Sequence, residues 1–180
     1  VTMILAGGAI ASLTQAVTSL LMIRSDPDLR PVLGWVLGGF TSAQWKHSVY
    51  LLPYLLPSLI LVMSYSRILN IFQLDDEQAL QLGVNVERTK VLLIAAATLS
   101  TAAAVSFSGI IGFVGLVAPH SVRLVWGADY RFLLPMSAIV GAAFLILADL
   151  VARTVASPTE LPVGIVTAFC GAPFLLYLLK

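Results

Sequence analysis

Long apolar stretches, separated by short polar turns, constrain the fold of this chain more than any other feature. A helix needs about 20 mostly apolar residues to cross the hydrocarbon core of a bilayer, because each residue adds about 1.5 Å. Six stretches come near that length, at residues 1–23, 49–68, 91–107, 109–126, 132–152 and 161–179. We therefore expect an all-α, polytopic transmembrane helical bundle with about six spans and short interfacial helices.

In three of these stretches we expect proline or glycine to affect the helix. Pro53 and Pro57 lie inside the second, where neighbouring groups in a membrane protein can bond the freed carbonyls. The fourth contains Gly112, Gly115 and Pro119, so we expect it to be short and irregular. We expect a further break in the sixth, at the Gly-Ala-Pro of residues 171–173.

The low content of charged residues agrees with burial in lipid. The chain is 59% hydrophobic and 11% charged, whereas a soluble domain carries about 25% charged residues. A net charge of +1 gives no electrostatic reason to expect a nucleic-acid partner. Cys170 is the only cysteine, which excludes an intrachain disulfide and a cysteine metal cluster, so we expect a small packing residue there.

The basic residues indicate which side of the membrane each loop occupies. Residues 31–40 are apolar but too short to span, so we expect a short interfacial or re-entrant helix with Trp35 at headgroup depth. With alternating spans, one side holds Arg67, Arg88, Lys90, Arg123, Arg131 and Lys180. The other side holds Arg24, Arg30, Lys46 and Arg153. This bias predicts that the 70–90 loop and residue 180 face the cytoplasm.

Motifs of membrane enzymes and of nucleotide binding do not occur in the sequence. It has no His-Glu-x-x-His, no Gly-x-Ser-x-Gly and no Gly-x-x-x-x-Gly-Lys. The two histidines, His47 and His120, are far apart. His120 follows Pro119, and we expect it to bond a carbonyl that the proline frees; a metal or proton site is the alternative.

Two polar features leave more than one interpretation open. Asp149 and Arg153 share a helix face at i, i+4 spacing, which favours a local ion pair over an arginine that meets a partner protein. Residues 75–83 have acidic residues at the front and Gly83 at the end, as in a short capped helix. Its apolar stripe could dock into a groove on another protein, or the segment could be a solvated loop.

Several longer motifs occur in an order that resembles one transporter family. They are Trp35-Val-Leu-Gly-Gly-Phe40, Leu82-Gly-Val-Asn-Val-Glu-Arg88, Gly109-Ile-Ile-Gly-Phe-Val-Gly-Leu-Val-Ala-Pro-His120, Gly127-Ala-Asp129, Ala148-Asp-Leu-Val-Ala-Arg153, Glu160-Leu-Pro-Val-Gly-Ile-Val-Thr167 and Gly171-Ala-Pro-Phe174. The chain resembles the permease subunits of the iron-siderophore, haem and vitamin B12 ABC importers, the FecCD/BtuC-like family. The likeness covers essentially the whole chain.

The resemblance implies a role for each polar feature. Residues 1–180 look like one transmembrane permease domain, the C-terminal half of a subunit with about four further helices upstream. Arg153 matches the arginine that docks the extracytoplasmic binding protein. The ATPase-coupling helix corresponds to Asp75, Asp76, Glu77, Gln78, Ala79, Leu82 and Gly83, with Leu80 where the family often has a basic residue. The translocation path corresponds to Ala6, Gly7, Ala9 and Ala11, and the structural motif to Gly112, Gly115, Pro119, His120, Arg123 and Asp149.

The same resemblance implies partners and a location. A transport subunit of this kind is not an enzyme, binds no metal or cofactor of its own and leaves ATP to a partner subunit. Its expected partners are an ABC ATPase subunit, a substrate-binding protein, a second permease copy and the lipid of a bacterial plasma (inner) membrane. An ion-coupled secondary transporter, which would need intramembrane carboxylates, and a membrane scaffold are the alternatives. Nothing in the sequence distinguishes siderophore, haem and cobalamin as cargo.

Overall fold

The computed structural model describes residues 2–24, 29–41, 43–73, 80, 85–155 and 161–178. The chain forms two compact units, Val1–Leu33 and Gly34–Lys180. The first contains α1 (Thr2–Arg24), a helix of 23 residues. Thr14 and Thr18 donate their hydroxyl groups to the carbonyls four residues earlier, at 2.8 Å each. These polar groups are therefore satisfied inside their own helix, as lipid requires.

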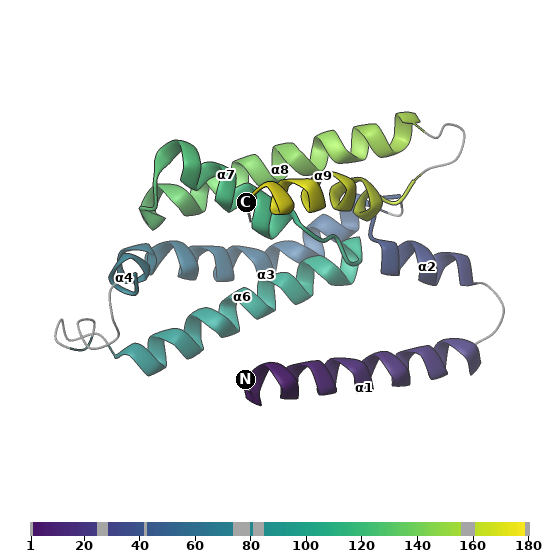
Figure 1. The fold of residues 1–180 in the computed structure, drawn as a ribbon, viewed down its shortest axis with the longest axis horizontal. Helices are drawn as coiled ribbons and strands as arrows, with labels where there is room; N and C mark the ends of the chain where they lie inside the picture. Colours follow the sequence, from purple (N-terminus) through teal and green to yellow (C-terminus); the bar gives the residue numbers. More distant parts are fainter. Residues whose placement is uncertain are drawn as a thin grey trace. The chain divides into compact units, whose positions relative to one another are not determined.

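The second unit is built from helices only, as far as the structure describes it (Figure 1). Its helices are α2 (Leu29–Leu37, from Gly34 on), α3 (Trp45–Ser64), α4 (Ser66–Ile71), α6 (Val86–Ser108), α7 (Val114–Trp126), α8 (Tyr130–Val155) and α9 (Val163–Leu178). The prediction of an all-α helical bundle is confirmed. The helix α3 continues across Pro53 and Pro57.

Two pairs of packed helices, and a further helix that contacts both members of one pair, hold this unit together. The most extensive contacts are those of α7 with α8 and of α3 with α6, while α9 packs on α8 and α7. Gly141 of α8 allows a close approach, since a Cβ there would lie 3.6 Å from Ala118 and from Val114 of α7. Small residues at such crossings are typical of helices that associate in lipid. Most large apolar side chains stay exposed, which leaves them available to lipid.

Within the part of the chain that the structure describes, three helices are long and apolar enough to cross a membrane, namely α3, α6 and α8. Residues Leu5–Leu21 of α1 and Val163–Leu178 of α9 form shorter apolar helices. The 13 residues of α7 reach about 20 Å, less than the hydrocarbon core of about 30 Å. The expected fourth stretch is thus irregular backbone at residues 109–113 followed by a short helix.

Element boundaries differ from the sequence prediction at three places. The helix α6 begins at Val86, because the Asn85 side chain accepts a hydrogen bond from the Arg88 N–H at 3.1 Å and caps it. The break before α7 covers residues 109–113, whereas Gly115 and Pro119 lie inside the helix. The break predicted at residues 171–173 was wrong, since α9 runs through Gly171 and Pro173.

Candidate functional site

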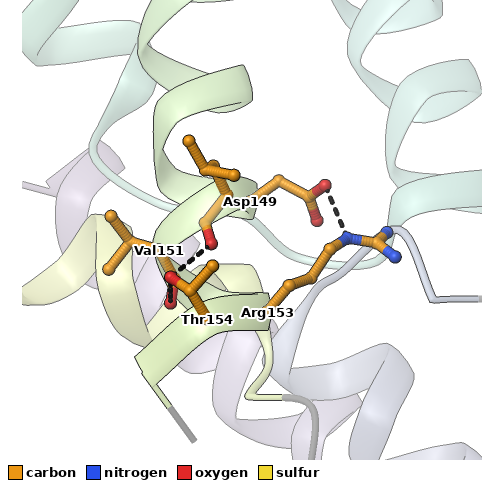
Figure 2. Close-up of polar contacts among 5 residues, drawn as sticks. Asp149, Val151, Arg153 and Thr154 are labelled. Carbon is orange, nitrogen blue, oxygen red and sulfur yellow. Dashed lines mark hydrogen bonds and ion pairs between the residues drawn. The ribbon is translucent and has the colours of Figure 1, made fainter. Parts of the chain in front are cut away.

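Asp149 and Arg153 lie one turn apart near the end of α8 and form an ion pair. Arg153 Nε lies 2.8 Å from Asp149 Oδ2, in the i, i+4 geometry that the spacing predicts. Figure 2 shows the guanidinium group beside the carboxylate. The Arg153 side chain is 45% exposed and that of Asp149 is 27% exposed. A cation held at a defined place on an exposed helix end can meet an acidic group on another protein.

The end of α8 that carries this pair is anchored on its buried face. Ala148 and Ala152 are buried against Val163 of α9. The backbone N–H of Leu161 donates to the Ala152 carbonyl at 3.3 Å. Thr154 Oγ1 donates to the Leu150 carbonyl at 2.8 Å (Figure 2). The last turns of α8 are therefore fixed while Arg153 remains accessible.

Close to the same core, backbone atoms of three segments meet directly, an arrangement we call the backbone interlock (residues 35–39, 108–110 and 164). Three hydrogen bonds join them. The Gly39 N–H donates to the Ser108 carbonyl at 2.8 Å, and the Gly164 N–H donates to the Gly38 carbonyl at 3.1 Å. The Ile110 N–H donates to the Trp35 carbonyl at 3.3 Å. Bonds of this kind satisfy irregular backbone, which lipid would otherwise penalise.

Glycine is required in the backbone interlock because the carbonyls approach so closely. Gly38 and Gly109 have φ of 71° and 70°, in the left-handed region that side chains disfavour. A Cβ at Gly109 would overlap the Trp35 carbonyl oxygen, and one at Gly164 would overlap the Leu37 carbonyl oxygen. Gly112 and Gly115, for which the sequence predicts a structural role, lie where a Cβ would meet nothing within 4 Å. Nothing in the residue pattern distinguishes the two sets.

Aromatic contacts join α7 to α9. Phe113 is the N-cap residue of α7, and its side chain lies against Gly171, where a Cβ would overlap it. The His120 ring lies edge-on to Phe174, with the centroids 6.1 Å apart and the planes at 78°. The expected bond from His120 to a carbonyl is not among the hydrogen bonds of the described residues. His120 thus makes a packing contact, and the described residues contain no group of three or more His, Cys, Asp or Glu that could hold a metal.

At the opposite end of α8, polar side chains from α4 and the α7–α8 turn form a network that we call the polar tie (Asn70, Gln73 and residues 128–131). Asn70 Nδ2 donates to Asp129 Oδ1 at 2.7 Å. Asn70 Oδ1 accepts from the Tyr130 N–H at 2.8 Å. Gln73 Nε2 donates to Asn70 Oδ1 at 3.1 Å and to the Ala128 carbonyl at 2.9 Å. The tie therefore fixes the residues after α4 against the start of α8.

The charge of Asp129 strengthens the polar tie. The backbone N–H of Arg131, which donates to Asp129 Oδ1 at 2.9 Å, lowers the pKa of this carboxyl, and the Asn70 side chain lowers it further. The Asp129 carbonyl also accepts from the Leu133 N–H at 2.8 Å. Neither Asn70 nor Asp129 was predicted as a site residue, because they are 59 positions apart and only the fold brings them together.

The predicted coupling helix lies almost wholly outside the described residues. Residues 75–79, 82 and 83 are not described, and Leu80, which is described, is exposed. Its two flanks lie near each other, since Lys90 Nζ is 5.7 Å from the centroid of the Phe72 ring. Two residues of the polar tie, Asn70 and Gln73, lie just before the predicted coupling segment in the chain.

The residues predicted to line a path lie on α1, in the first unit. Ala6 and Ala9 are three positions apart and share one face of the helix, while Gly7 and Ala11, four apart, share another. Arg123 is exposed in the last turn of α7, and its carbonyl accepts from the Gly127 N–H at 3.0 Å. Cys170, expected to be a packing residue, is exposed on α9.

A groove of about 760 Å³ lies between α3, α6 and α7. His47 lies in it, with its ring centroid 5.2 Å from that of Phe107. The hydroxyl groups of Ser100 and Thr101 donate to carbonyls of their own helix, at 2.9 and 2.8 Å. Among the described residues that line the groove there is no Asp, Glu, Lys or Arg. Such a lining suits apolar contacts rather than ion binding.

Comparisons with known proteins agree with this arrangement. A family model described as the FecCD transport family matches residues 1–180. The chain is 49% identical over 179 residues to a cobalamin import system permease protein of Halobacterium salinarum, covering 99% of this chain and 48% of that protein. It is 43% identical over 178 residues to a hemin transport system permease protein of Yersinia pestis, covering 98% and 53%.

A solved structure has the same fold. It is described as an inward-facing conformation of a metal-chelate type ABC transporter, and it matches with a TM-score of 0.89 and 34% sequence identity. The match covers 96% of this chain and 58% of that one. The chain spans about half the length of the curated relatives it matches.

Proposed function

Because this chain belongs to the FecCD transport family, we propose that it is a membrane-spanning part of the permease subunit of an ATP-driven importer for a metal chelate. The observation that carries the proposal is the match over the whole chain to permeases named for cobalamin and for hemin, at 49% and 43% identity. An iron-siderophore complex belongs to the same class of cargo. The proposed location is the plasma membrane, with a second permease subunit as partner.

Arg153 is the proposed docking residue for an extracytoplasmic binding protein. Its exposure, its position at an end of α8 and its pairing with Asp149 support this role. An acidic side chain on the binding protein would supply the complementary charge. The ion pair and the docking role, which the sequence left as alternatives, are compatible, since Asp149 orients the guanidinium group toward a fixed direction.

Residues 75–83 are the proposed contact with the ATPase, and the described residues before them, Asn70 and Gln73, bond the turn that precedes α8 and its first residue. We infer a cytoplasmic position from the excess of basic residues on that side. ATP binds and is hydrolysed on the partner, so the permease makes and breaks no covalent bond. Closure of the ATPase would move the coupling segment, and the helices would change between outward-open and inward-open arrangements. Ala6, Gly7, Ala9 and Ala11 of α1 would line the path.

Reconstitution tests the proposal. The permease that contains this chain is placed in liposomes with its ATPase, and the binding protein is added outside with radiolabelled cyanocobalamin or with haemin. We expect uptake that requires ATP at the ATPase and stops when the ATPase is made catalytically inactive. Uptake driven by an ion gradient without the ATPase would contradict the proposal and would favour a secondary transporter.

A further inference from the structure

The polar tie joins the chain just before residue 74 to the first turn of α8. One side chain of α4, Asn70, bonds this turn twice, through its nitrogen to Asp129 at 2.7 Å and through its oxygen to the Tyr130 N–H at 2.8 Å. Asp129 Oδ1 also accepts from the Arg131 N–H at 2.9 Å. Asn70 therefore contacts both the side chain and the backbone at the beginning of α8.

This contact is unusual because helices normally satisfy their first N–H groups locally. The first N–H groups of a helix have no partner inside it, and a capping side chain or water accepts them. In α8 the Arg131 N–H bonds the local Asp129, but the Tyr130 N–H bonds Asn70, 60 positions earlier. The end of α4 and the first turn of α8 cannot move apart without losing these bonds.

The geometry of α8 extends the effect of the tie. The helix has 26 residues, a length of about 39 Å, and α7 packs along it. A shift at its first turn therefore tilts a long, continuous element. We infer that Asn70 and Asp129 are positioning residues that carry movement of the 75–83 segment into α7 and α8. The inference rests on the proposed function, in which that segment contacts the ATPase.

Asn85 provides a matched control at the other flank of the same segment. It is also an asparagine that caps a helix, since its Oδ1 accepts from the Arg88 N–H at 3.1 Å. That bond stays within α6 and its cap. Among the hydrogen bonds of the described residues, none joins Asn85 to α7 or α8. Its loss should weaken a helix start without breaking a link to α8.

The experiment measures uptake and ATP hydrolysis on the same proteoliposomes, made with the permease, its ATPase and its binding protein. Radiolabelled cyanocobalamin and haemin are the probes. The variants are Asn70→Ala, Asn70→Asp, Asn85→Ala and the exchange Asn70→Asp with Asp129→Asn. The exchange keeps one carboxylate and one carboxamide, so the side-chain bond between residues 70 and 129 and the bond from the Tyr130 N–H to residue 70 can form again. The Arg131 N–H loses its acceptor, because a carboxamide nitrogen replaces Asp129 Oδ1. Asn70→Asp alone places two carboxylates in contact.

We expect Asn70→Ala and Asn70→Asp to lower the number of probe molecules transported per ATP hydrolysed by about fivefold or more, the lower end of coupling effects between two sites. The exchange should restore that ratio, and Asn85→Ala should leave it unchanged. A merely structural role would not give these two results together. They are a fall in probe molecules transported per ATP while hydrolysis continues, and recovery of that number in the exchange variant.

If the wild type takes up a probe in response to ATP but the Asn70 variants keep the same number of probe molecules per ATP, the inference is overturned. The proposed function would still stand. An equal fall in Asn85→Ala, or an exchange variant that hydrolyses ATP without recovering the ratio, would overturn the inference as well. If wild-type vesicles took up neither probe, nor a ferric siderophore offered in the same way, in response to ATP, the proposed function and this inference would fail together.

Discussion

The two ends of α8 are held by different kinds of contact. At its end near Ala152, buried alanines pack on α9 and the neighbouring segments meet through the backbone interlock. At its start, exposed side chains of the polar tie make the contacts. Water competes for the polar groups of the tie, so each of these hydrogen bonds adds little to stability. The start is therefore held by a few polar groups within reach of water, whereas the other end is held by packed side chains and backbone.

This difference agrees with the proposed roles of the two ends. A docking site must keep its shape while the rest of the permease moves, and Arg153 lies on the tightly packed end. A coupling element must pass on a displacement, and two residues of the polar tie, Asn70 and Gln73, precede the predicted coupling segment in the chain. Both features occur on one continuous helix. A movement at the start of α8 would therefore turn the helix about its tightly packed end.

The largest effect should follow from Gly109→Ala, which would place a methyl group on the Trp35 carbonyl oxygen at a φ of 70°. We expect the free energy of unfolding to fall by about 3 kcal/mol, because overpacking and a left-handed backbone are both costly for a side chain. Thermal unfolding of the purified permease in detergent measures it. The control is Gly115→Ala inside α7, where a Cβ meets nothing within 4 Å. An equal fall in the free energy of unfolding of the two variants would show that the backbone interlock does not require glycine at position 109.

Charge reversal at Arg153 should have the next largest effect. Arg153→Glu would break the pair with Asp149 and repel an acidic partner, so the Kd for the binding protein should rise about tenfold or more, as for one interfacial charge pair. Surface plasmon resonance with the permease in nanodiscs measures this Kd. Arg131→Glu, on the same helix at its other end, is the matched control and should leave docking unchanged. Wild-type affinity in Arg153→Glu would exclude the docking role.

The smallest effect concerns the pH dependence of the polar tie. Because the pKa of Asp129 is lowered in the folded state, its ionised form adds stability above the unfolded pKa of about 3.9. That contribution should disappear as the pH falls through the lower, folded pKa. The stability difference between wild type and Asp129→Asn should thus be constant near neutral pH and shrink below about pH 4. A difference that grows on acidification would contradict the hydrogen bonds assigned to Asp129.

The sequence predicted most helices because a bilayer leaves a polytopic chain few other structures. It also predicted the ion pair of Asp149 and Arg153, since both lie on one helix at a fixed spacing. It did not identify Gly38, Gly109 and Gly164, whose importance depends on carbonyls contributed by distant segments. It missed the contact of Asn70 with Asp129 for the same reason. The break predicted at Pro173 was wrong because a helix packed on neighbours can continue through proline.

Hydrogen exchange measured by mass spectrometry on the reconstituted transporter, with and without ATP trapped on the ATPase, tests the contrast between the two ends most directly. We expect the amides of Gly39, Ile110 and Gly164 to exchange slowly in both states, because backbone carbonyls bond them in a packed region. The amides of Tyr130 and Arg131 should exchange faster and change their protection when ATP is trapped. Protection that changes at the backbone interlock, and not at the polar tie, would contradict the account.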